Sequence, residues 1–314
     1  MRVGTITKST GKHYIIKDHQ DGTAHLGLIR GKFKLDGYKL TNPVGVGDEV
    51  QFTIEGEYAI IQKIENRENY VVRQSPRKKH FMHLLAANID QALLVITIIE
   101  PKLKQGFIDR FLLMTEPYNI PVIVVFNKAD LWGEEDRMIY DYLSEIYTSI
   151  GYQIIATSTI NGEGISELQA SLSGKRTLCA GQSGVGKSSL INTLAPNLDL
   201  RTQDLSDYSG KGQHTTTFAE MYDLEVGTEL IDTPGIKSLA FNHLEVMDIA
   251  HNFRELFIHS KDCKFNDCTH RNEPKCAIKA ALESGDISTL RYENYLQLID
   301  ENENQNYWER ITDY

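Results

Sequence analysis

The stretch RTLCAGQSGVGKSSLIN, residues 176–192, indicates the fold of the central part of the chain. An apolar run typical of a buried strand comes first. A glycine-rich turn with the pattern G-x-x-x-x-G-K-S then leads into a helical segment. Glycines at such a turn let the backbone wrap closely around phosphates, so that amide N–H groups point inward at the start of a helix. We therefore expect a phosphate-binding loop made by Gly181, Gln182, Ser183, Gly184, Val185, Gly186, Lys187, Ser188 and Ser189.

Two side chains at the end of this loop are suited to bind a phosphate group and a metal ion. Lys187 is expected to reach the β- and γ-phosphates, and the Ser188 hydroxyl is expected to bind Mg²⁺. A fortuitous glycine-rich turn is the alternative, but the strand before the pattern and the helix after it argue against that interpretation. The loop alone leaves open which nucleotide binds.

The segment Asn127-Lys128-Ala129-Asp130 directly follows the apolar run PVIVVF. The Asp130 carboxylate can accept hydrogen bonds from guanine N1–H and N2–H, a pair of donors that adenine lacks. Asn127 can bond the far edge of the base, and the stem of Lys128 can lie over the ring. Such a four-residue pattern is by itself often a surface turn. At the carboxyl end of a strand, where ligands of α/β proteins bind, and together with the phosphate loop, it predicts GTP and GDP as ligands.

Two later segments are candidates for contacts with Mg²⁺ and the γ-phosphate. In the run ELIDTPG, Asp232 can hold the metal and the Gly235 amide can meet the phosphate, although alone this run would be a Pro-Gly turn. The loop GKGQHTTT, residues 210–217, precedes it and offers hydroxyl groups to the Mg²⁺ shell, chiefly those of Thr215 and Thr216.

The surrounding sequence indicates a doubly wound α/β domain. Short apolar runs without alternation are typical of strands buried on both faces of a parallel sheet, and helical stretches separate them. The runs are ALLVITII, PVIVVFN, YQIIATS, RTLCAG and ELIDTPG, beginning at Ala92. The third run ends in Thr157 and Ser158, where a backbone amide can lie near guanine O6.

The N-terminal quarter differs from this domain in pattern and in charge. Short strands with turns such as Asp21-Gly22 and Asp36-Gly37 predict a small β-barrel or sandwich. Residues 1–80 hold 14 Lys and Arg against 9 Asp and Glu, a net charge of +5, whereas the remainder holds 19 against 34, a net charge of −15. Residues 73–80 lack apolar periodicity and resemble an exposed basic linker. A basic N-terminal segment in an otherwise acidic chain suggests a polyanionic partner.

Three of the four cysteines lie close together near the C-terminus, in a helical and polar region. The pattern Cys263-x4-Cys268-x-His270-x5-Cys276 offers three thiolates and one imidazole, which fits a structural Zn²⁺ site with all four positions filled. A chance cluster of buried cysteines is the alternative. The fourth, Cys179, is expected to be a small buried apolar residue in its strand.

In an ordinary GTPase the phosphate loop comes first in the sequence and the guanine-binding segment comes late. In this chain the guanine-binding segment precedes the phosphate loop, so the order of the motifs is rotated. This arrangement closely resembles the ribosome small subunit-dependent GTPase A family, known as RsgA or YjeQ, through NKAD, GQSGVGKSS, GQHTTT, DTPG and the cysteine pattern. The resemblance covers essentially the whole chain. It implies an OB-fold barrel, a circularly permuted GTPase domain and a mostly helical zinc-binding domain, which we expect at residues 1–72, 73–240 and 241–314. It also implies binding to the small ribosomal subunit late in its maturation, and stimulation of GTP hydrolysis by that subunit.

The catalytic group is expected to be His214. Ras-like GTPases orient the attacking water with a glutamine directly after the DxxG motif, but Ile236 stands there in this chain. His214 lies among the loop hydroxyls and can orient or deprotonate water, a role that the resemblance also implies. The alternative is that His214 only packs or contacts RNA.

Composition excludes some other classes of protein. The net charge of −10 argues against a general nucleic-acid binder, and no apolar run is long enough for a membrane span. The N-terminus lacks the apolar core of a signal peptide, so we expect a cytoplasmic chain, and nothing requires more than a monomer. Two functional alternatives remain open: an RNA-binding module that uses nucleotide with negligible turnover, and a GTPase of the large subunit or of membrane traffic.

Overall fold

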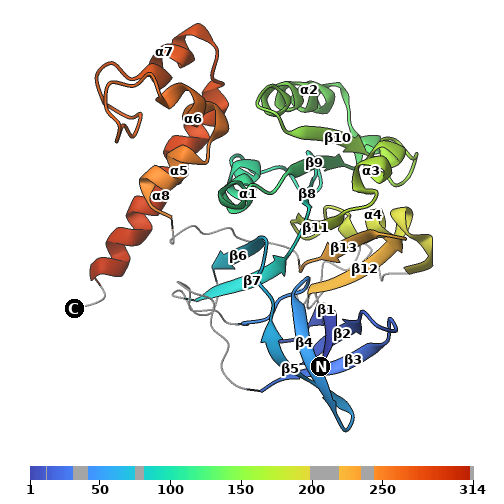
Figure 1. Cartoon of the computed structure of the whole chain (residues 1–314). Coiled ribbons are helices and arrows are strands. Elements are labelled where there is room, and N and C mark those ends of the chain that lie inside the picture. Colours follow the sequence, from blue (N-terminus) through green and yellow to red (C-terminus); the bar gives the residue numbers. More distant parts are fainter. Residues whose placement is uncertain (12, 31–41, 75–80, 199–218, 235–243, 312–314) are drawn as a thin grey trace.

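The computed structural model describes residues 1–11, 13–30, 42–74, 81–198, 219–234 and 244–311, and it describes side chains for these residues except 73–74 and 305–311. Three parts follow one another along the chain: an N-terminal barrel, a central sheet covered by helices, and a helical arm, which we define as residues 244–311 (Figure 1). Among the described residues, no helix is long and apolar enough to cross a membrane.

The N-terminal part is a closed five-stranded barrel. The strands pair in the order β1-β2-β3-β5-β4, and β4 also pairs with β1, which closes the barrel. The β3–β5 pair is parallel, and the other pairs are antiparallel. Apolar side chains that alternate along these strands fill its centre, for example Ile6, Ile16 and Phe52. This confirms the predicted OB-type barrel. The strands are β1 (Arg2–Ser9), β2 (Tyr14–Asp18), β3 (Ala24–Ile29), β4 (Glu49–Glu55) and β5 (Tyr58–Ile64).

The central sheet has the strand order β10-β9-β8-β11-β13-β12, and all its strands except β12 run parallel. Strand β12 also pairs with β1, which joins the sheet to the barrel edge to edge. The strands are β8 (Gln91–Ile96), β9 (Val122–Asn127), β10 (Gln153–Thr157), β11 (Arg176–Gly181), β12 (Ala219–Glu225) and β13 (Thr228–Asp232).

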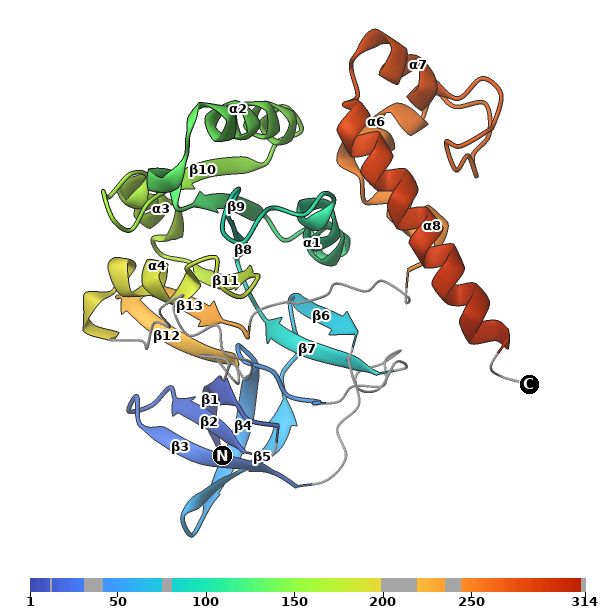
Figure 2. The same cartoon turned by 180° about the vertical axis from the view of Figure 1, so that it is seen from behind.

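Helices cover both faces of this sheet, as the sequence predicts. Leu94 of β8 packs with α1 and α2 on one face, whereas Leu93 and Val95 pack with α3 and α4 on the other. Figure 2 shows the same layers from behind. The helices are α1 (Phe107–Thr115), α2 (Glu134–Ser149), α3 (Ile165–Leu172) and α4 (Lys187–Leu194), with 3-10 turns η1 (Glu116–Tyr118), η2 (Ala129–Leu131) and η3 (Pro196–Leu198).

A two-stranded ribbon lies where the sequence suggests a linker. Strand β6 (Tyr70–Gln74) pairs with β7 (Met82–Ala87), and the pairs Arg73↔His83 and Gln74↔Met82 belong to this ladder. The linker expected at residues 73–80 is therefore shorter, because backbone pairing to β7 draws its first two residues into a strand despite their lack of apolar periodicity. The remaining residues 75–80 lie outside the described part of the chain.

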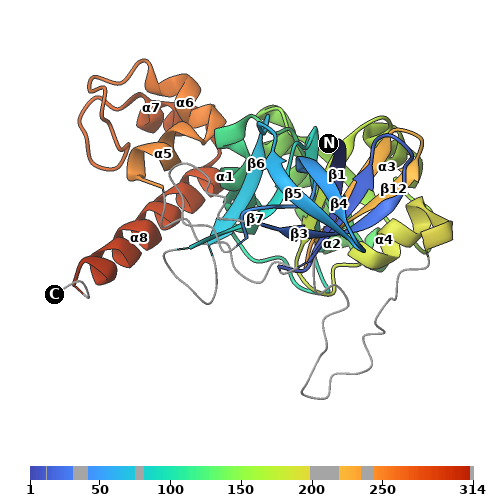
Figure 3. The same cartoon turned by 60° about the horizontal axis from the view of Figure 1, so that its bottom comes forward.

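The helical arm contains α5 (Val246–His251), α6 (Arg254–Ser260), α7 (Ala277–Ser284) and α8 (Thr289–Ile311), and it lies to one side of the sheet, beside α1 (Figure 3). The long helix α8 packs on α5 and α1, and apolar residues of the arm continue the core on the α1 face of the sheet. This confirms the predicted mostly helical C-terminal part.

A buried ionic network fixes the arm against the central domain. The guanidinium of Arg291 on α8 donates to both carboxylate oxygens of Glu255 on α6, at 2.7 and 2.9 Å, and to Asp109 on α1 at 2.5 Å. Asp109 also accepts hydrogen bonds from Tyr147 and Asn294, at 2.6 and 2.5 Å. Since a buried charge is costly unless it is paired and hydrogen-bonded, this arrangement favours one position of the arm over others.

Replacement of Arg291 by Met should lower the free energy of unfolding by about 3–5 kcal/mol, because it leaves Asp109 and Glu255 buried without their cation. Urea unfolding of the full chain measures the loss. The control Arg30→Met breaks a two-pronged pair with Glu55 that is 66% and 44% exposed, and should cost about 1 kcal/mol or less. Equal effects of the two substitutions would contradict this account of the arm.

Candidate nucleotide-binding site

The predicted phosphate loop connects β11 to α4 at the carboxyl edge of the parallel sheet. Gly181 ends the strand, and Gly184 and Gly186 have φ angles of +85° and +91°. Helix α4 begins at Lys187, directly after Gly186 in the left-handed conformation. The chain thus turns sharply between a buried strand and a helix N-terminus, which is the geometry that presents amide groups to phosphate.

Lys187 lies inside this loop. Its side chain is buried, and its ammonium donates to the carbonyls of Gly181 and Gln182, both at 3.0 Å. Burial lowers the pKa of Lys187, and the nearby Asp232 carboxylate opposes that shift. The cation is therefore held at the centre of the loop by weak carbonyl acceptors, which a phosphate oxygen can replace.

Asn127 joins the predicted base-binding segment to the phosphate loop. Its side-chain amide donates to the carbonyl of Val185 at 2.9 Å, across 58 residues of sequence. Its carbonyl oxygen accepts a hydrogen bond from the Thr157 hydroxyl at 3.0 Å. The three strands β9, β8 and β11 lie side by side and run parallel, so their carboxyl ends meet at one edge. The two motifs that the sequence separates are thus in direct contact.

Asp130 and Lys128 are each held by a neighbour. The Ser158 hydroxyl donates to the exposed carboxylate of Asp130 at 2.5 Å, and it also accepts the amide of Ile160 at 3.1 Å. Lys128 has a left-handed backbone, with φ at +65°, and its ammonium donates to the Glu100 carbonyl at 2.8 Å. Burial lowers the pKa of Lys128.

The sequence assigned only a backbone amide to the Thr157-Ser158 segment. In the structure its two hydroxyl groups orient the side chains of Asn127 and Asp130. The contact between Lys128 and the loop after β8 was not foreseen either. No sequence pattern marks the hydroxyl groups of Thr157 and Ser158 or the carbonyl of Glu100 as hydrogen-bond partners. These contacts can be recognised only once the fold brings the segments together.

Asp232 ends β13 next to the phosphate loop. The carboxylate is buried, and it acts electrostatically on both Lys187 and Cys179. Ser188 and Ser189 lie in the first turn of α4 and are half-buried. These positions fit a Mg²⁺ ion at the phosphate end of the site, because a carboxylate and a hydroxyl are oxygen ligands of the kind that Mg²⁺ prefers. The other predicted contacts, Thr215, Thr216 and Gly235, lie outside the described residues, as does His214.

The cysteine cluster forms a second site, in the helical arm. The ligand atoms of Cys263, Cys268, His270 and Cys276 all lie within 4.8 Å of one another. His270 Nδ1 lies 3.6 Å from Cys263 Sγ and 3.5 Å from Cys276 Sγ, and these two sulfur atoms are 4.0 Å apart. A tetrahedral zinc ion with ordinary bond lengths separates its ligand atoms by roughly 3.5–3.8 Å. The group is therefore arranged to hold a metal ion.

Surrounding contacts hold this loop in shape. Tyr292 and Tyr295 on α8 donate to the carbonyls of His270 and Thr269, at 2.6 and 2.8 Å. The amide of Ala277 donates to Cys263 Sγ at 3.3 Å. Burial lowers the pKa of His270, which favours the neutral imidazole that metals bind. Such outer contacts orient metal ligands.

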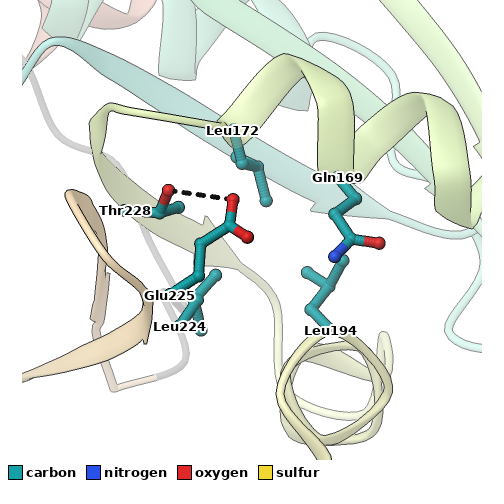
Figure 4. Close-up of a pocket in the computed structure, with 6 residues that line it drawn as sticks. All are labelled: Gln169, Leu172, Leu194, Leu224, Glu225 and Thr228. Carbon is teal, nitrogen blue, oxygen red and sulfur yellow. Dashed lines mark hydrogen bonds between the residues drawn. The ribbon is translucent and has the colours of Figure 1, made fainter.

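A small pocket elsewhere in the central domain is unrelated to these sites. It has a volume of about 20 Å³ and lies between α3, α4 and the β12–β13 turn, where Glu225 accepts a hydrogen bond from Thr228 (Figure 4). Thr228 begins β13, whereas the phosphate loop is at the opposite edge of the sheet. A space of this size holds about one water molecule, so it is not a ligand site.

Fold and site together define a phosphate-loop nucleotide-binding protein in which the base-binding segment precedes the phosphate loop. A sequence model described as RsgA GTPase matches residues 64–242, and the chain belongs to this family. It is 44% identical to the small ribosomal subunit biogenesis GTPase RsgA of Christiangramia forsetii, over 99% of both chains. It is also 44% identical to the protein of that name from Phocaeicola vulgatus, over 97% of this chain and 98% of the relative.

Two solved structures are similar over nearly the whole chain. YjeQ from Thermotoga maritima is 34% identical, with a TM-score of 0.75 over 96% of this chain and 98% of that one. YloQ, described as a circularly permuted GTPase, is 28% identical, with a TM-score of 0.71 over 96% of this chain and 95% of that one. These comparisons confirm the family and the fold that the motifs predict.

Replacement of Gly186 by Ala should displace the Asn127 side-chain amide from the Val185 carbonyl, because the new Cβ would lie 2.5 Å from Asn127 Nδ2. Gly184→Ala is the matched control: its φ is equally positive, but the nearest atom to its Cβ is Pro101 Cδ at 3.8 Å. Both variants carry the left-handed strain of roughly 1–2 kcal/mol. Gly186→Ala should lose at least about 1 kcal/mol more. Urea unfolding without nucleotide tests this, and equal losses would count against the contact.

Proposed function

We propose that this chain hydrolyses GTP to GDP and phosphate during maturation of the small ribosomal subunit. The observation that carries the proposal is the hydrogen bond from Asn127 to Val185, which places the guanine-type segment against the phosphate loop. Membership of the RsgA GTPase family supports the same activity. The relatives that match over nearly their whole length are named for biogenesis of the small subunit.

The proposed selectivity for guanine rests on Asp130. Its carboxylate accepts N1–H and N2–H of guanine, while the Ser158 hydroxyl donates to the same carboxylate at 2.5 Å and orients it. Adenine has no such donor pair, so it would leave the carboxylate without these two bonds. Asn127 bonds the far edge of the base, and the Lys128 stem covers the ring. Thr157 fixes the orientation of Asn127.

The proposed phosphate chemistry rests on Lys187 and the loop amides. The Lys187 ammonium leaves its two carbonyl acceptors for the β- and γ-phosphate oxygens, and the amides of Gly181 to Ser189 surround the same oxygens. Mg²⁺, when bound through Ser188 and Asp232, neutralises charge that develops on these phosphates. Water attacks the γ-phosphorus, the bond to the β–γ bridging oxygen breaks, and GDP leaves with inorganic phosphate.

His214 is the proposed residue that orients or deprotonates the attacking water. The glutamine that serves Ras-like proteins is replaced by Ile236, whose side chain has no hydrogen-bonding group. Thr215 and Thr216 follow His214 directly and complete the proposed Mg²⁺ shell, and the Gly235 amide meets the γ-phosphate. We propose that binding to the ribosomal subunit orders this loop.

The proposed partner is the RNA of the small subunit. Residues 1–80, which include the barrel strands, have a net charge of +5 in an otherwise acidic chain, and such a positive segment favours a polyanionic partner. The cytoplasm is the proposed location, since ribosomal subunits mature there, and a monomer the proposed state. We retain residues 1–72, 73–240 and 241–314 as the proposed domains.

The function is tested by measuring phosphate release from GTP with and without purified small subunits, with large subunits as the control. We expect stimulation by small subunits only. His214→Ala should keep GTP binding and lose stimulated turnover by about 10²–10⁴-fold, the usual contribution of an acid–base group. Negligible turnover with subunits would favour a nucleotide-gated RNA-binding module. Stimulation by large subunits would favour a role in their assembly.

We also propose that the cysteine cluster binds one structural Zn²⁺. All four tetrahedral positions are supplied by the chain, so none is left for a catalytic water. The purified chain should contain about one zinc ion, as is usual for a site with four protein ligands. Cys268→Ser should remove the ion and lower the thermal unfolding midpoint, because metal binding and folding are coupled. Cys179→Ala, in the buried strand β11, should retain the metal. Retention of zinc by Cys268→Ser would contradict the assignment.

A further inference from the structure

The loop after β8 (residues 97–103) is held in shape by a buried hydroxyl group. Thr97 directly follows β8 and is 2% exposed. Its hydroxyl donates to the carbonyl of Pro101 at 2.7 Å, and the amide of Leu103 donates to the carbonyl of Ile98 at 3.2 Å. The first residues of the loop are thus joined to its last residues by two hydrogen bonds, which favour one conformation of the segment between them.

The sheet places this loop beside both nucleotide motifs. Strand β8 lies between β9 and β11 (Figure 2). Ile96, the last residue of β8, pairs with Phe126, and Val95 pairs with Gly181. The base-binding segment directly follows Phe126, and the phosphate loop begins at Gly181. The loop after β8 therefore leaves the sheet between the two motifs, at the same carboxyl edge.

Lys128 is fixed by this loop at the end of its side chain. Its ammonium donates to the carbonyl of Glu100 at 2.8 Å, and Glu100 directly precedes the Pro101 that Thr97 holds. The stem of Lys128 passes close to the phosphate loop, because its Cε lies 4.0 Å from the position of a Cβ on Gly186. The side chain that is proposed to cover the base is therefore held in one position by the Glu100 carbonyl.

Such a restraint on Lys128 favours nucleotide binding. A lysine side chain has many rotamers, and the loss of this freedom on binding a ligand weakens the affinity. The hydrogen bond to Glu100 restricts the rotamers of Lys128 before a ligand arrives, so less freedom is lost when a base binds against its stem. The position of the Glu100 carbonyl depends in turn on the hydrogen bond from Thr97 to Pro101.

We propose that Thr97 is a positioning residue for the nucleotide base, which acts through the Glu100 carbonyl on Lys128. The Thr97 hydroxyl holds the loop after β8 in the conformation in which Glu100 keeps the Lys128 stem over the base. This inference rests on the proposed function, because it requires that Lys128 covers the base. It adds to that function a buried residue outside the sequence motifs.

Removal of the Thr97 hydroxyl tests the proposal. Thr97→Val should weaken binding of GDP by roughly three- to tenfold, because Lys128 is then ordered only when the ligand binds. Thr97→Ala removes the same hydroxyl with less bulk and should give a similar loss, whereas Thr97→Ser keeps the hydroxyl and should restore the affinity. Calorimetric titration of the full chain with GDP and Mg²⁺ measures these affinities.

A buried threonine elsewhere in the central domain provides the matched control. Thr115 on α1 is 0% exposed, and its hydroxyl donates to the carbonyl of Leu112 at 2.9 Å. Thr115→Val should leave the affinity for GDP unchanged, since this hydrogen bond lies within α1. Urea unfolding of each variant compares their stabilities. An equal loss of GDP affinity in Thr115→Val and Thr97→Val would contradict a specific role of Thr97.

A double-mutant cycle tests whether Thr97 acts through Lys128. Lys128→Met keeps an apolar stem and removes the ammonium that bonds Glu100, so Thr97→Val should cause no further loss of GDP affinity in that background. Pyrophosphate has no base, and its affinity should be the same in Thr97→Val and in the wild-type chain. Additive losses in the double variant, wild-type affinity of Thr97→Val for GDP, or an equal loss for pyrophosphate would each overturn the proposal. Failure of the wild-type chain to bind GDP would overturn the proposed function as well.

Discussion

The hydrogen bond between the Asn127 side chain and the Val185 carbonyl is the contact on which the nucleotide site depends. It joins the segment predicted to read the base to the loop predicted to bind the phosphates, although these enter from different parts of the sequence. Asn127 can reach Val185 only because β9, β8 and β11 run parallel and end at the same edge. Gly186 permits the approach, since any larger residue would overlap the Asn127 amide.

The rotated order of the motifs does not change the carboxyl edge of the parallel sheet, where the nucleotide site lies. It changes which segments of the chain follow the strands that end at this edge. Strand β13 ends at Asp232, beside Lys187, and the chain continues from there toward the helical arm. The arm is fixed on α1 by the Arg291–Asp109–Glu255 network. The segments expected to respond to the γ-phosphate therefore directly precede the domain that holds the cysteine cluster. We propose that a change in these segments on hydrolysis reaches the arm through this direct connection.

The sequence predicted the barrel, the doubly wound sheet, the family and the cysteine cluster, because each has a local or periodic pattern. It did not predict the pairing of β6 with β7, the network around Arg291 or the hydrogen bond from Thr97 to Pro101. An arginine or asparagine on a polar helix such as α8 looks like any surface residue until Asp109, from a helix 182 residues away along the chain, is placed against it. Long-range contacts of this kind depend on tertiary packing rather than on spacing. The roles of His214, Thr215, Thr216 and Gly235 stay predictions, since these residues lie outside the described chain.

The most direct test of the central claim is competition between GTP and ATP for the full chain, measured by displacement of a fluorescent GDP derivative in the presence of Mg²⁺. If the segment that contains Asp130 and the phosphate loop form one pocket, GTP should displace the probe at a concentration at least roughly 100-fold lower than ATP, because adenine cannot make two charge-assisted hydrogen bonds to the carboxylate. Equal displacement by the two nucleotides would contradict the account.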